Sequence, residues 1–180
     1  MIRYEPCLSS PLRRNGVFFT KMVAARVART HSNADPAVIV DGGRLTMGAE
    51  DNIKTAQTLY EAFGRGDVQT ILNHLTDDID WSAESASTVA PWYGIRRGKE
   101  EVGAFFQDLA AAAEVLEFTP TTFGSNDTEV FAVVRYRASS RATGKTTEMN
   151  VHHWFKFRDD KVCFWRGSED TAQSEAALSD

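Results

Sequence analysis

The chain has 180 residues, a formal net charge of −5, 42% hydrophobic residues and two cysteines. This length allows one domain with a real core, and the acidic balance argues against a nucleic-acid partner. The two cysteines make neither a disulfide framework nor a zinc pattern, and no apolar run reaches the eighteen residues of a membrane span. We therefore expect a globular protein of a reducing compartment, the cytoplasm.

The first 34 residues differ from the rest, because they carry six basic residues against one acidic residue. They contain VFFTKMVAARVARTHS, which could form the basic amphipathic helix of a targeting peptide. The following HSNADPAVIVDGGRLTM shows no clear period, and Met47 offers a second start. An upstream or disordered leader, a transit peptide to an organelle and a docked arm all stay open, the leader being favoured. We place the functional domain at 48–175, after a leader at 1–47 and before a flexible tail at 176–180.

Helical spacing starts near Asp51. Apolar residues recur at three- and four-residue steps over 53–63, and again over 68–75, which predicts two helices. Asp51 or Asn52 can cap the first helix, the glycines of GRGD end it, and Asp67 can cap the second.

Alternating side chains follow. DDIDWSAE predicts a strand with Ile79, Trp81 and Ala83 on one face, and after a loop over 85–98 a third helix is expected from Val102.

The rest of the chain has strand character. VLEFTPTTF is broken by Pro120, which favours an edge or a bulge, and strands are expected over 128–139, over 147–158 and in VCFWRGSED. The order α-α-β-α-β-β-β-β predicts an α+β fold with helices on one face of a curved, mainly antiparallel sheet.

The stretch EMNVHHWFKF carries two adjacent histidines. On a strand, successive side chains point to opposite faces, so His153 joins an apolar set that includes Val151 and Phe155, while His152 faces out. Adjacent strand histidines do not readily chelate one metal, and the other histidines have no acid at ligand spacing. We expect no metal and no cofactor.

The turn between the last two strands decides which residues meet His153. A two-residue turn at the aspartates of RDDK places His153 opposite Arg166, whereas a three-residue loop RDD places it opposite Trp165. We favour the three-residue loop, because the second aspartate tolerates a left-handed conformation and because a face with Cys, Trp and Gly is easier to bury.

In that register Trp165, Gly167 and Glu169 share the face of His153. An imidazole near a carboxylate in an apolar pocket is a plausible general acid–base pair, because histidine titrates near neutrality and the carboxylate fixes its tautomer. His153 and Glu169 are therefore the catalytic candidates.

Three segments, LYEAFGRGDVQTILNHLTDDIDW, WYGIRRGKEEVGAFFQDL and HHWFKFRDDKVCFWRGSED, together resemble the NTF2-like superfamily in its SnoaL-like and ketosteroid-isomerase-like branch, over roughly residues 50–171. The resemblance implies a cone, in which a bent sheet wraps a long first helix and leaves an apolar pocket, and a homodimer packed through the sheet. This fold hosts isomerases, polyketide cyclases, dehydratases, epoxide hydrolases and non-catalytic binders.

The catalytic residues of these relatives are only partly matched. The tyrosine of the isomerases falls at Leu59, one residue before Tyr60, their base falls at or near Ala83, and their second acid falls at His153. The acid of the cyclases falls at Gly167. Any chemistry here must therefore use a different set of residues.

We interpret the chain as a pocket protein for a hydrophobic small molecule, and as a possible isomerase, cyclase or dehydratase acting on a carbonyl compound. The alternative is a non-catalytic ligand-binding or dimerisation module. The side chains expected to contact the ligand are aromatic or charged: Tyr60, Trp81, Trp92, Tyr93, Phe106, Arg135, Trp165 and Asp170.

Overall fold

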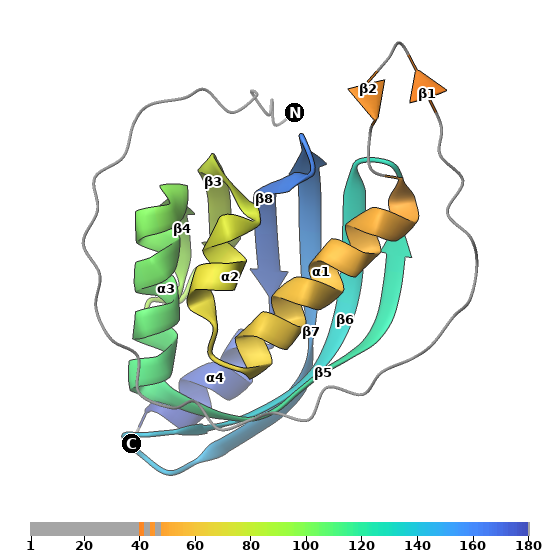
Figure 1. The fold of residues 1–180 in the computed structure, drawn as a ribbon. Coiled ribbons are helices and arrows are strands. Elements are labelled where there is room, and N and C mark those ends of the chain that lie inside the picture. Colours follow the sequence, from red (N-terminus) through yellow and green to blue (C-terminus); the bar gives the residue numbers. More distant parts are fainter. Residues whose placement is uncertain (1–39, 42–43, 46–47, 180) are drawn as a thin grey trace.

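The computed structural model describes residues 40–41, 44–45 and 48–179 (Figure 1). Residues 1–34, with the expected targeting helix, lie outside the described residues. Two short strands, β1 (Val40–Asp41) and β2 (Arg44–Leu45), pair with each other in antiparallel fashion.

The remaining elements form one layer of helices against one sheet (Figure 1). Their bounds are α1 (Ala49–Gly64), α2 (Val68–Asn73), β3 (Leu75–Ala83), β4 (Gly94–Arg97), α3 (Gly98–Ala112), β5 (Ala113–Ser125), β6 (Glu129–Ser140), β7 (Thr146–Arg158), β8 (Lys161–Ser168) and α4 (Thr171–Leu178). The sheet order is β4-β3-β8-β7-β6-β5, and β3–β8 is its parallel pair. The predicted α+β class is confirmed.

The ends of the first two helices follow from local chemistry. α1 begins after Gly48, which supplies no side-chain cap, so the expectation that Asp51 or Asn52 caps it is wrong. Asp51 instead lies in the first turn, where a carboxylate is favourable beside the helix N-terminus. Gly66 ends the turn with a φ of 69°, and the Asp67 side chain accepts a bond from the Thr70 amide, as predicted.

Four elements were not predicted. β1 and β2 lie within the expected leader at 1–47, β4 arises within the segment that we expected to be a loop, and α4 covers residues that we expected to be partly a tail. The expected domain end at 175 falls inside α4, whose Ala177 is buried and whose carbonyl accepts a bond from Thr143 Oγ1. Residues 176–178 are therefore part of the folded domain.

The strands β5 and β6 confirm the alternation. β5 is an edge strand and its register shifts beside Pro120, because proline cannot donate a ladder hydrogen bond. β6 turns Val134 and Tyr136 inward and Arg135 outward. The core therefore lies between the helices and the concave face of the sheet.

The β7–β8 hairpin corrects the favoured register. Its turn has two residues, Asp159 and Asp160, with φ values of 53° and 63°, so the three-residue loop is wrong. The register then shifts beyond Phe157, so that His153 pairs with Gly167, and neither expected partner lies opposite it. The extra residue lies in β8, between the partners of Phe157 and Lys156. Beyond this bulge, the odd-numbered residues of β8 face the concave side of the sheet together with His153.

Candidate functional site

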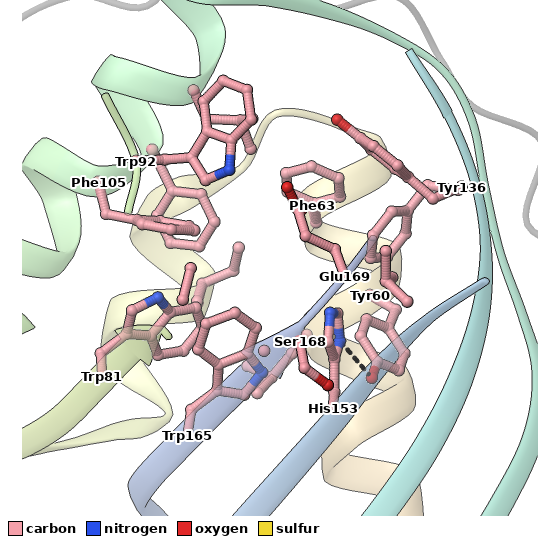
Figure 2. Close-up of a pocket in the computed structure, with 18 of the residues that line it drawn as sticks. Tyr60, Phe63, Trp81, Trp92, Phe105, Tyr136, His153, Trp165, Ser168 and Glu169 are labelled. Atoms are coloured by element: carbon pink, nitrogen blue, oxygen red, sulfur yellow. Dashed lines mark hydrogen bonds between the residues drawn. The ribbon is translucent and has the colours of Figure 1, made fainter. Parts of the chain in front are cut away.

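A cavity opens on the concave face between α1, α3 and the strands β3, β7 and β8 (Figure 2). Its volume is about 100 Å³. Its wall is aromatic and aliphatic apart from a few polar side chains, namely Tyr60, Tyr136, His153, Ser168 and Glu169. Apolar pockets with few polar groups are typical small-molecule sites.

Tyr60 on α1 and His153 on β7 meet inside this cavity. The Tyr60 hydroxyl lies 2.9 Å from Nδ1 of His153, and it has no other partner among the described residues. A buried hydroxyl needs an acceptor for its proton, so we assign Tyr60 as the donor and Nδ1 as the acceptor. The neutral ring then carries its proton on Nε2, which Figure 2 shows directed into the cavity.

Burial decides the charge of this pair. Desolvation, with a smaller contribution from His152, lowers the pKa of His153 to about 3. Burial also raises the pKa of the Tyr60 hydroxyl well above its usual value. Both groups are therefore neutral at physiological pH, and His153 presents an N–H donor rather than a basic nitrogen.

Glu169 follows the end of β8 and lines the same cavity, but it does not bond to His153. Its Oε1 accepts hydrogen bonds from the Tyr93 hydroxyl at 2.5 Å and from Ser174 Oγ at 2.6 Å. Burial, together with the neighbouring carboxylate, raises the pKa of Tyr93. Glu169 therefore links helix α4 to the segment that precedes β4. No described residue bonds its second carboxylate oxygen, Oε2.

Two indoles form the opposite wall. Trp81 on β3 and Trp165 on β8 stack with centroids 4.0 Å apart at 17°, and Trp165 meets the His153 ring edge-on at 4.9 Å. Gly167 makes this possible, because a Cβ there would lie 2.4 Å from Trp165 Cη2. The absence of a side chain at 167 therefore sets the position of Trp165.

Gly167→Ala is expected to push Trp165 off Trp81 and to lower the free energy of unfolding by about 1–3 kcal/mol. Near-ultraviolet circular dichroism reports the indole packing, and urea denaturation reports stability. Gly124→Ala is the matched control, because Gly124 also lies in a strand but a Cβ there meets nothing within 4 Å. Equal effects of the two substitutions would contradict this packing role.

The structure brings most of the expected ligand contacts together. Tyr60, Trp81, Trp92, Phe106 and Trp165 line the cavity with His153 and Glu169. Tyr93 is buried behind Glu169.

Two expected contacts lie elsewhere. Arg135 is on the outer face of the sheet, where it pairs with Glu117 and Glu148, because β6 turns its apolar set inward. Asp170 accepts a bond from the Gln173 amide as the cap of α4, so it serves the helix and not the cavity.

Tyr136 and Ser168, which were not predicted as ligand contacts, also line the cavity. The alternation of β6 indicated Tyr136, but it left open which face of that strand points inward. The residue at the base position of the isomerases, Ala83, lines the cavity, whereas the adjacent Glu84 is exposed and pairs with Arg166 at 2.8 Å. Glu84 therefore does not take the place of the isomerase base in the cavity.

Two further findings concern the described part of the chain. None of its helices is both long and apolar enough to span a bilayer. Within these residues, no three His, Cys, Asp or Glu side chains gather closely enough to hold a metal ion.

Solved structures share this architecture. An NTF2-like protein of unknown function from Burkholderia pseudomallei K96243 is 20% identical with a TM-score of 0.65, over 72% of this chain and 98% of that one. A proposed polyketide cyclase from Xanthomonas campestris pv. campestris is 18% identical with a TM-score of 0.61, over 73% and 98%. An LEH-like epoxide hydrolase from M. tuberculosis is 15% identical with a TM-score of 0.58, over 72% and 90%. These identities establish the NTF2-like fold alone.

No curated protein sequence matches the chain. The SnoaL-like domain profile matches residues 56–165, which include α1 from Ala56 onward, the strands from β3 to β7, and β8 as far as Trp165. That match spans more than half of the chain, and the protein therefore belongs to the SnoaL-like domain family.

Proposed function

We propose that this domain binds an uncharged hydrophobic carbonyl compound and moves a proton on it, as an isomerase, cyclase or dehydratase does. The observation that carries the proposal is the His153 ring, whose Nδ1 is occupied by Tyr60 and whose Nε2 faces the aromatic cavity. A fixed N–H donor in an apolar site is suited to a carbonyl oxygen that gains negative charge.

The charge of the wall favours a neutral ligand. His153 is uncharged because burial lowers its pKa to about 3, and Glu169 is the acidic side chain in the cavity wall. An anionic ligand would therefore meet a carboxylate without a compensating cation there. The indoles of Trp81 and Trp165 offer flat apolar surface instead.

Glu169 completes the proposed reaction as the base. The two hydroxyls fix Oε1, which leaves Oε2 able to take a proton from the carbon next to the carbonyl. The C–H electron pair moves into the carbonyl, and the resulting enolate oxygen is held by His153 Nε2–H. Return of the proton from Glu169 to a carbon completes an isomerisation with no net change in protons.

Exchange of the C2 hydrogens of 1-tetralone in D₂O, followed by NMR, tests this function without knowledge of the natural substrate. We expect the protein to accelerate exchange by about a hundredfold or more over buffer. Binding of 1-tetralone without any acceleration would contradict catalysis.

That result would favour the alternative, a non-catalytic binding module. One observation supports it: the bonds from Tyr93 and Ser174 tie Glu169 to α4, as expected of a structural carboxylate. Thermal stabilisation by neutral ring ketones in the absence of exchange is the expected behaviour of such a module.

We also propose that two copies pair through the outer face of the sheet, as the family resemblance implies. Phe131 is 48% exposed there and stacks on Trp154 at 5.7 Å, and Trp154 packs on Phe164. Sedimentation velocity should give a dimer mass, and Phe131→Glu should give a monomer with unchanged secondary structure. A wild-type monomer at micromolar concentration would contradict this pairing.

A further inference from the structure

A second, smaller cavity of about 20 Å³ lies between α4 and the sheet. Trp92 and Tyr136 line both this cavity and the larger one. Figure 2 shows these two side chains on opposite sides of the larger cavity, with Tyr136 on the same side as Tyr60. The two cavities are therefore neighbouring chambers that share Trp92 and Tyr136 as walls.

Two hydroxyls in the smaller chamber have no hydrogen-bond partner among the residues that the structure describes. Tyr136 is 8% exposed and Thr147 is 7% exposed, and neither hydroxyl bonds to a described residue. The other hydroxyls of the chamber are engaged: Ser140 Oγ accepts from the Thr143 amide, and Ser174 Oγ donates to Glu169. Neither oxygen is sealed off by the surrounding protein, so both hydroxyls open onto accessible space and can bond a polar group that enters the chamber.

We propose that the chamber beneath α4 is a subsite for a hydroxyl or carbonyl oxygen of the ligand, held by Tyr136 and Thr147. This inference rests on the proposed function, in which a first carbonyl oxygen of the same ligand meets His153. Burial raises the pKa of Tyr136, so its hydroxyl stays protonated and can donate. The ligand class is thereby narrowed to neutral ring compounds with oxygen functions at both ends.

The strand register sets the length of such a ligand. Tyr136 pairs with Met149, which lies four residues from His153 on β7, or about 13 Å along the strand at about 3.3 Å per residue. Both side chains line the larger cavity (Figure 2). A fused two-ring compound is of suitable length to join them.

Isothermal titration calorimetry with 1-tetralone and 6-hydroxy-1-tetralone tests the subsite. The hydroxyl of the second compound lies at the far end from the carbonyl, so the wild-type protein should bind it about fivefold more tightly, as expected for one additional hydrogen bond. Thr147→Val and Tyr136→Phe should reduce this preference to about one. Thr147 lines only the smaller chamber, so Thr147→Val should change the affinity for 1-tetralone little. Thr146→Val is the matched control, because Thr146 is the exposed neighbour on the same strand.

The outcomes separate the two proposals. Equal affinity of the wild-type protein for both tetralones, or a preference that survives in both variants, would overturn the subsite while leaving the proposed function intact. Failure of both tetralones to bind would overturn the proposed function and the subsite with it. The two variants remove a single oxygen or exchange it for a methyl group, and their thermal unfolding shows whether each is folded.

Discussion

Replacing Glu169 by glutamine is expected to slow protein-catalysed exchange of 1-tetralone by about 10²–10⁴-fold, because an amide cannot take the proton. The amide oxygen can still accept the bonds from Tyr93 and Ser174, so the fold and the affinity for 1-tetralone should change little. Exchange rates measured by NMR, with affinity measured by calorimetry, separate the loss of a base from the loss of a binding site.

Glu84→Gln is the matched control for this experiment. Glu84 follows the cavity residue Ala83 in the chain, but its side chain is exposed and pairs with Arg166. The Glu84→Gln variant should therefore exchange 1-tetralone at the wild-type rate. If Glu169→Gln exchanges as fast as wild type, Glu169 is not the base, and its role is confined to holding α4.

Substituting phenylalanine for His153 is expected to lower the exchange rate by about 10²–10³-fold, because the enolate oxygen loses its N–H donor. Phenylalanine suits the apolar wall, where Trp165 already meets the ring edge-on at 4.9 Å. Tyr60→Phe should have a smaller effect, since it releases Nδ1 but leaves the ring in place. A variant at 153 with wild-type exchange would show that the imidazole takes no part.

The same substitution should alter the dependence of stability on pH. His153 has a pKa of about 3 in the folded chain and about 6.5 in the unfolded chain, so below pH 6.5 only the unfolded chain gains this proton. The neutral His153 ring therefore contributes fully to the free energy of unfolding above pH 6.5. This contribution is lost as the pH falls towards 3, by up to about 1.4 kcal/mol per pH unit. His153→Phe should remove that slope, and His152→Gln, on the outer face, should keep it. Urea denaturation at pH 5 and pH 7 measures this change. An equal loss of stability between pH 7 and pH 5 in all three proteins would contradict the burial of a neutral imidazole.

Most helices and strands could be predicted from the sequence, because the residue spacing that indicates them is local. Three- and four-residue spacing predicted the helices, and strict alternation placed Trp81 and His153 on the inner face of their strands. α4 was not predicted, because TAQSEAAL has almost no apolar periodicity. Its position depends on the bond from Ser174 and on the burial of Ala177.

The site depended on information that spacing does not carry. The Tyr60–His153 bond joins residues 93 positions apart, and the Glu169 bonds depend on Tyr93 and on the unforeseen α4. The pairing of Glu169 with His153 was expected from a shared face, but a shared face fixes direction and not distance. The shift beyond Phe157 had no sequence signal either, because a bulge inserts one residue without changing the alternation on each side of it.

The tautomer of His153 is the central claim, and NMR of the ¹⁵N-histidine-labelled protein measures it directly through two- and three-bond ¹H–¹⁵N correlations. His153→Phe identifies the signal. We predict an unprotonated Nδ1 and a protonated Nε2, unchanged between pH 8 and pH 5 because the pKa of His153 is about 3. A proton on Nδ1, or a ring that becomes an imidazolium near pH 6.5, would contradict the account.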